Sequence, residues 1–140
     1  MQNGLGIWID HKRALLVWVA EGTETREDIP SNLERHTRLA GGSPAKTPWG
    51  PQDVAAERRR ERRYQLHCER YYDRVALRIR TAERIFLAGP GVAKHEFHKH
   101  LKRYAGIENR ITAVETLDKM TDRQFAARVR EHFEREGVRA

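Results

Sequence analysis

The sequence predicts an α/β protein: a single three-layer domain, residues 1–140, with a mixed β-sheet and packed helices. Three observations support this class. The length of 140 residues suits one domain. The first 30 residues contain short apolar runs of strand length, separated by polar turns. After residue 52, long segments with helical periodicity alternate with short apolar runs, which is the pattern of helices packed on a sheet.

The first part of the chain predicts three strands. Residues 5–10 and 13–19 are apolar runs of strand length, and the polar pair His11-Lys12 between them predicts a hairpin turn. Glu21-Gly22 predicts the next turn, and the threonine-rich residues 23–29 predict a third strand with an exposed face. Pro30 indicates a sheet edge or a bulge, because proline lacks the donor that a central strand needs. Residues 33–39 are either a short continuation or another strand.

A loop and a long basic helix follow. Residues 40–52 are rich in glycine and proline and predict a mobile loop. Residues 53–80 predict a helix, with Asp53 as its N-cap. The first half of this helix is dominated by arginine and has almost no apolar face, so we expect it to project beyond the core. Tyr71, Val75 and Ile79 recur at helical spacing, so the second half should pack on the sheet.

The remaining chain predicts two more strands and two more helices. The apolar run 84–88 predicts a buried strand, and Gly89-Pro90-Gly91 ends it. Residues 92–104 predict a helix, and 110–115 predict the last strand. Thr121 and the residues after it can cap a final helix.

The composition predicts an anionic partner. The net charge is +7, and most of the positive charge is arginine, whose planar guanidinium suits phosphate. The N-terminus shows no signal peptide and no apolar run approaches the roughly 18 residues of a membrane span, so we expect a soluble, cytoplasmic protein. The single cysteine, Cys68, excludes an intramolecular disulfide and is interpreted as a packing residue.

The candidate RNA-binding residues lie in the loop, at the start of the long helix and after the buried strand. Arginines and a helix N-terminus attract phosphate, and Trp49 can stack on a base or act as an apolar lid on the sheet. Lys94, in the first turn of its helix, can hold an anion, although a plain strand-to-helix turn explains the same residues. The set is Lys46, Trp49, Arg58, Arg59, Arg62, Arg63 and Lys94.

Two further constellations concern metals, and neither leads us to expect a metal or another cofactor. His95, His98 and His100 stand close together with Glu96, but no fourth ligand is apparent, so surface histidines are the favoured interpretation. Three carboxylates near predicted strand ends would suit a two-metal nuclease if they converged. They are Asp10, Glu115 and Asp118.

The order of these segments resembles the central domain of archaeal and eukaryotic class 1 release factors and of Pelota, and the stand-alone bacterial relatives of that domain. Residues 7–14 resemble the opening hairpin, and the glycine-rich loop with its Arg/Glu-rich helix stands where release factors carry Gly-Gly-Gln. Residues 85–97 are similar to the strand, Gly-Pro-Gly turn and Lys/Phe helix of Pelota-like proteins. Residues 111–133 fit the last strand and helix, so the resemblance covers nearly the whole chain.

The resemblance implies a ribosome-associated, RNA-binding translation factor that acts in rescue or dormancy. It would place loop 40–52 near tRNA or the peptidyl-transferase centre, with the ribosome and its rRNA or tRNA as partners. The nearest match to Gly-Gly-Gln is Gly50-Pro51-Gln52, in which Pro51 replaces the middle glycine. Gln52 and Gly50 are therefore the candidate catalytic residues of an alternative, a peptidyl-tRNA hydrolase. Whether the chain is an enzyme stays open, and a metal-dependent nuclease is the other alternative.

Overall fold

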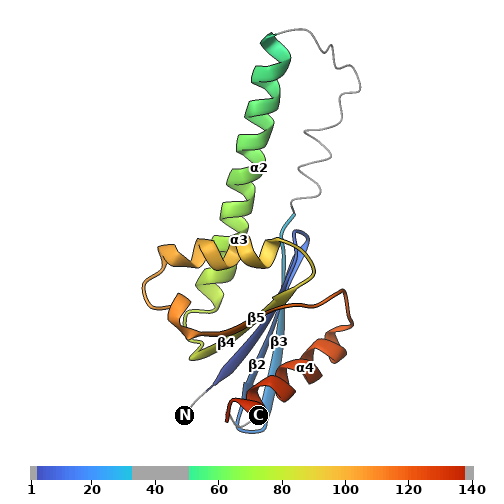
Figure 1. Cartoon of the computed structure of the whole chain (residues 1–140), viewed down its shortest axis with the longest axis vertical. Coiled ribbons are helices and arrows are strands. Elements are labelled where there is room, and N and C mark those ends of the chain that lie inside the picture. The colour runs from blue at the N-terminus through green and yellow to red at the C-terminus, as the bar shows by residue number, and fades with distance from the viewer. Residues whose placement is uncertain (1–2, 33–50, 138–140) are drawn as a thin grey trace.

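The computed structural model describes residues 3–32 and 51–137, and the predicted strand at 33–39 and loop residues 40–50 lie outside them. The described residues form one five-stranded mixed sheet, three α-helices and two short 3₁₀ helices (Figure 1). The strands are β1 (Gly4–Ile9), β2 (Arg13–Ala20), β3 (Thr23–Pro30), β4 (Arg84–Gly89) and β5 (Ile111–Thr116). The helices are α2 (Pro51–Arg78), α3 (Ala93–His100), η1 (Leu101–Arg103), η2 (Glu108–Arg110) and α4 (Asp122–Arg135).

The sheet has the order β3-β2-β1-β4-β5, with β1 antiparallel to β2 and parallel to β4. The predicted hairpin is confirmed: Asp10 Oδ1 accepts hydrogen bonds from the backbone N–H groups of Lys12 and Arg13, both at 2.8 Å. Glu21 and Gly22 both have positive φ, as a tight turn between β2 and β3 requires. β3 is an edge strand among the described residues, which explains why Pro30 and a polar face are tolerated there.

Helices cover both faces of the sheet, so the predicted three-layer architecture is confirmed. On one face, Leu5, Ile7 and Ile9 pack with the second half of α2 and with α3. On the other face, α4 covers residues of β1, β2 and β4 (Figure 1). Gly6 allows this close approach, because a Cβ atom there would lie 2.1 Å from Val129 Cγ2 of α4.

Several element boundaries differ from the predictions. α2 begins at Pro51, two residues before the predicted N-cap Asp53, so Pro51 and Gln52 belong to its first turn and not to a loop. Proline suits a first helical turn, because its φ is already helical and its missing N–H has no helical acceptor there. The helix predicted over 92–104 is shorter: α3 ends at His100 and a 3₁₀ turn follows.

The last helix starts as predicted. Thr121 accepts a hydrogen bond from the Gln124 backbone N–H, and the Gln124 side chain accepts one from the Thr121 N–H, which completes a capping box. Within the described ranges, no helix combines the length and the apolar character that a membrane span requires.

Candidate nucleic-acid interface

The long helix α2 has two halves with different surroundings. Its second half is anchored in the core through Tyr71, Tyr72, Val75 and Ala76, all of which are buried. Its first half extends beyond the sheet and the other helices (Figure 1). This division follows from the sequence, because the first half offers no apolar stripe that could be buried.

The free half carries four exposed arginines, Arg58, Arg59, Arg62 and Arg63, here called the arginine face. At 3.6 residues per turn they cover an arc of about 140° on the side of the helix roughly opposite its core-facing residues. Glu57 and Glu61 fall outside this arc, so the charges are segregated around the helix. Three of the arginines line an open hollow together with Val54 and Ala55.

No member of the arginine face forms an ion pair or a side-chain hydrogen bond with another residue in the part of the chain that the structure describes. In the second half of α2 two arginines are engaged: Arg78 pairs with Glu27, and Arg74 donates to the Ser31 carbonyl oxygen at 3.2 Å. Unpaired guanidinium groups keep their five donors available, and these donors match phosphate oxygens in charge and geometry.

Polar contacts fix the direction of the free half by clamping the second half of α2. Glu96 Oε1 of α3 accepts hydrogen bonds from Tyr72 Oη at 2.7 Å and from His11 Nε2 at 2.9 Å. Burial acts to raise the pKa of Glu96, but these two bonds outweigh it and lower the pKa. Tyr71 Oη donates to the Asp10 carbonyl oxygen at 3.0 Å, which ties α2 to the hairpin as well.

A second cluster lies one turn further along α3. Asp73 Oδ1 accepts from Tyr104 Oη at 2.5 Å and pairs with His100 Nε2 at 2.7 Å. Burial acts to raise the pKa of Asp73, but the bonds from Tyr104 and His100 lower it overall. His100 is buried, so its interpretation as a surface histidine was wrong. The helical spacing of Phe97, His100 and Leu101 would have predicted that His100 is buried, because it lies on the same side as the two apolar residues.

The other predicted site residues lie apart from the arginine face. Lys94 is buried with 2% exposure, and its Nζ donates to the Gly91 carbonyl oxygen at 2.6 Å. It therefore closes the strand-to-helix turn, and its position gives no support for contact with phosphate. Lys46, Trp49 and Gly50 lie outside the described residues. Gln52 is placed only as part of the first turn of α2.

The three carboxylates of the nuclease hypothesis do not form a metal site in the described residues. Asp10 caps the hairpin turn, and both carboxylate oxygens of Glu115 accept from Arg128 at 2.7 and 2.8 Å. Asp118 is exposed. Over residues 3–32 and 51–137 no group of three or more His, Cys, Asp or Glu side chains is arranged to hold a metal ion.

Cys68 is a packing residue, as predicted. It is buried in the cluster between the sheet and α2. Burial raises the pKa of its thiol, and a hydrogen bond with Tyr64 opposes this only in part. A thiol with a raised pKa is a poor nucleophile at neutral pH.

Comparison with known proteins shows similarity in fold. No family model matches the sequence, and no curated protein matches it. Pelota from Archaeoglobus fulgidus aligns with a TM-score of 0.52 and 14% identity, over 96% of this chain and 36% of Pelota. Pelota from Thermoplasma acidophilum aligns with a TM-score of 0.51 and 10% identity, over 86% of this chain and 30% of that protein. An archaeal translation termination factor aligns at a TM-score of 0.48, which supports no inference about this chain.

These alignments confirm the predicted resemblance in fold to part of Pelota. The chain spans about a third of the length of the Pelota structures it matches. At identities of 14% and 10%, the similarity concerns the fold alone.

Proposed function

We propose that this chain is a ribosome-associated translation factor module that binds RNA through the arginine face of α2. The observation that carries the proposal is a set of four exposed arginines on the free half of a clamped helix, none of which pairs with another described residue. The fold shared with part of Pelota directs the choice of RNA partner toward the translation machinery.

The geometry suits contact with phosphates along an RNA backbone. Arg58 and Arg62, like Arg59 and Arg63, are four residues apart and therefore lie about 6 Å apart along the helix axis. Two such pairs present guanidinium groups to neighbouring phosphates without any need to bend the helix. Contacts of this kind position a protein on nucleic acid and carry no sequence information.

In this proposal, α2 acts as a rigid arm that brings its N-terminal end deep into the ribosome, to rRNA or tRNA. The predicted loop residues 40–50 precede that end in the sequence and would be placed near tRNA or the peptidyl-transferase centre, in ribosome rescue or in dormancy. Lys46 and Trp49 are proposed to add contacts there. Gln52, in the first turn of α2, would stand at the same end.

Binding through four phosphate contacts has a measurable signature. Each contact releases condensed counterions, so the slope of log K against log salt steepens by about 0.7 to 0.9 per contact. Loss of the arginine face should therefore make this slope shallower by about 3.

The experiment is sedimentation of the tagged protein with ribosomes across a salt series. The test variant replaces Arg58, Arg59, Arg62 and Arg63 with glutamine. The control variant makes the same change at four exposed cations elsewhere, each without an ion pair to another described residue: Arg80, Lys102, Lys119 and Arg123. Both variants lose four positive charges, and circular dichroism verifies that both remain folded.

We expect the test variant to lose most of its ribosome binding and about 3 units of salt slope, while the control keeps both. Equal losses in the two variants would show that binding depends only on net charge, and the arginine face would have no special role. Absence of binding by the parent protein would remove the ribosome from the proposal.

A further inference from the structure

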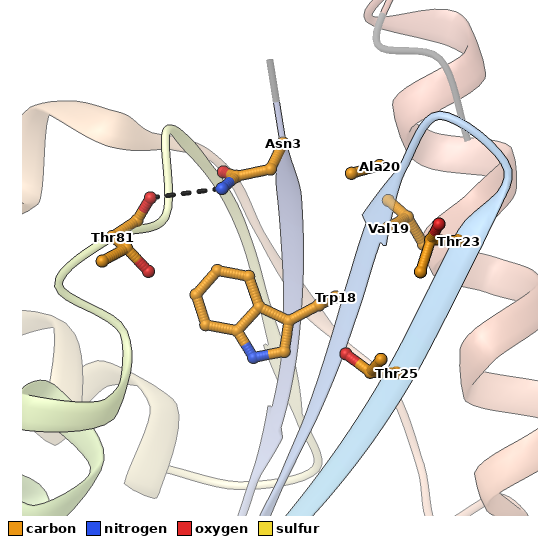
Figure 2. Close-up of a pocket in the computed structure, with 7 residues that line it drawn as sticks. All are labelled: Asn3, Trp18, Val19, Ala20, Thr23, Thr25 and Thr81. Atoms are coloured by element: carbon orange, nitrogen blue, oxygen red, sulfur yellow. Dashed lines mark hydrogen bonds between the residues drawn. The ribbon is translucent and has the colours of Figure 1, made fainter. Parts of the chain in front are cut away.

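A hollow lies on the α2 side of the sheet, beyond the point where α2 ends. Its volume is about 330 Å³, at the lower end of the range of roughly 300–1,000 Å³ that is typical of small-molecule sites. Figure 2 shows the Trp18 indole between Asn3 and Thr81 on one side and Thr25 on the other. The lining residues are Asn3, Trp18, Val19, Ala20, Thr23, Thr25 and Thr81.

The topology explains why this part of the sheet is left uncovered. Trp18 pairs with Thr25 and Ala20 pairs with Thr23, so these four side chains lie on one face of the sheet. The same face is covered by α2 further along the strands, where Arg78 pairs with Glu27. α2 ends at Arg78, and the chain then turns toward β4. The ends of β2 and β3 therefore keep an open surface.

The chemistry of the lining is specific in two respects. No lining residue carries a charge, although the protein as a whole has a net charge of +7. Trp18 is half-buried and packs against the core cluster, so its ring is held in place. Thr23 and Thr25 are exposed, and their hydroxyl groups form no hydrogen bond with another described residue.

We propose that this hollow binds an unpaired nucleobase of RNA, stacked on Trp18 and hydrogen-bonded at its edge to the threonine hydroxyls. A neutral lining favours a neutral planar group over phosphate, because no cation is present to compensate a charge. Bases splayed out from single-stranded RNA are recognised in this way, by an aromatic platform together with polar groups at the base edge. An aromatic side chain of a partner protein could stack on the Trp18 ring, but it would leave most of the polar groups of the hollow without a hydrogen bond.

The inference rests on the proposed function only in taking RNA as the source of the base. The lining of the hollow includes Thr81, three residues beyond the end of α2, whereas the arginine face lies on the N-terminal half of this helix. Arg63, the member of the arginine face nearest to the hollow in the sequence, is separated from the end of α2 at Arg78 by about 22 Å along the helix axis. The base site would therefore contact a second, distant segment of the RNA, and it would add selectivity for unpaired bases that the phosphate contacts lack.

The test uses the full chain and neutral nucleosides, adenosine and uridine, followed by NMR of the tryptophan indole N–H signals. Trp18→Phe identifies the signal of Trp18. We expect a saturable shift of this signal on addition of nucleoside, with an affinity that is nearly independent of salt. Salt independence separates this site from the arginine face, whose binding falls steeply with salt.

Three variants test the assignment. Trp18→Ala should weaken nucleoside binding at least fivefold through loss of stacking. Thr25→Val keeps the shape and the indole but removes one hydroxyl, so binding should weaken about two- to tenfold even if Trp18→Ala disturbs the core. Thr116→Val, at an exposed position of β5 outside the hollow, should bind as the parent does.

The inference is overturned if nucleosides cause no saturable shift at Trp18, or if Thr25→Val binds them as tightly as the parent. Tighter binding of N-acetyl-tyrosinamide than of either nucleoside would also overturn it, since the occupant would then be a protein side chain. Ribosome binding without nucleoside binding would refute this site and leave the proposed function intact. Nucleoside binding without ribosome binding would support this site and refute the proposed function.

Discussion

The cluster of Asp73, His100 and Tyr104 tests most directly whether polar contacts hold α2 in place against the rest of the fold. Asp73→Ala removes the acceptor for two hydrogen bonds, from Tyr104 Oη at 2.5 Å and from His100 Nε2 at 2.7 Å. The His100 side chain is only 4% exposed, so its ring nitrogen loses its partner in a place that water reaches poorly. Unsatisfied buried groups of this kind cost more than exposed ones.

The expected loss of stability follows from the two hydrogen bonds and from the exposure of the Asp73 side chain. A hydrogen bond to a charged group contributes about 1.5–3 kcal/mol when buried, but the Asp73 side chain is 45% exposed, which calls for the lower end. We therefore expect Asp73→Ala to reduce the free energy of unfolding by about 2 kcal/mol. For a domain of this size the corresponding fall in Tm is about 8 °C.

Thermal and urea unfolding, followed by circular dichroism, measure this loss. Glu69→Ala is the matched control, because Glu69 lies one turn earlier on α2 and pairs with Arg103 at 3.1 Å, with both side chains largely exposed. That exposed pair should contribute less than about 1 kcal/mol. Equal destabilisation by the two variants, or a loss below about 0.5 kcal/mol for Asp73→Ala, would refute the idea that this cluster clamps α2.

Three further predictions concern acid stability, packing and capping. The pKa values of Glu96 and Asp73 are lowered in the folded state. Their contribution to the free energy of unfolding is therefore present above their unfolded pKa values and is lost as the pH falls through the folded ones. The urea midpoint should consequently fall less steeply below about pH 4.5 in Asp73→Ala than in the parent. Gly6→Ala should reduce the free energy of unfolding by about 1–3 kcal/mol, because the new Cβ would lie 2.1 Å from Val129 Cγ2. Calorimetry should show a smaller loss of stability when the same change is made in a Val129→Ala background, and equal losses would contradict the packing explanation. Thr121→Ala should reduce stability by about 1 kcal/mol through loss of the capping box, and a variant as stable as the parent in urea would show that the cap is dispensable.

Local patterns in the sequence predicted much of the fold. The hairpin at His11-Lys12 and the buried run at the start of β4 depend on turn residues and on apolar runs, which are short-range signals. The capping box at Thr121 is equally local. The division of α2 into a free and a packed half was also predictable, because an arginine-rich segment without an apolar stripe cannot be buried.

Contacts between distant residues were not predictable in the same way. His11 and Glu96 are 85 positions apart, and only the packing of the hairpin beside α3 brings them together. Lys94 shows the opposite difficulty: its place in a first helical turn suggested an anion site, but its ammonium group is used by the Gly91 carbonyl oxygen. A single sequence does not distinguish these outcomes, since both place a lysine just after a glycine-rich turn.

The candidate site was predicted in part. The four arginines of the arginine face are exposed on the half of α2 that was predicted to project, and their contact with RNA stays a prediction. The hollow beside Trp18 had no sequence signal, because it depends on where α2 stops relative to the ends of β2 and β3. Loop residues 40–50 stay a prediction, and so does the role of Gln52.

The most direct test of the central claim is a cryo-electron microscopy map of the protein bound to ribosomes. The account predicts that the free half of α2 lies against RNA, with density joining Arg58, Arg59, Arg62 and Arg63 to phosphates. A map in which the arginine face points to solvent, while another surface contacts the ribosome, would contradict the account.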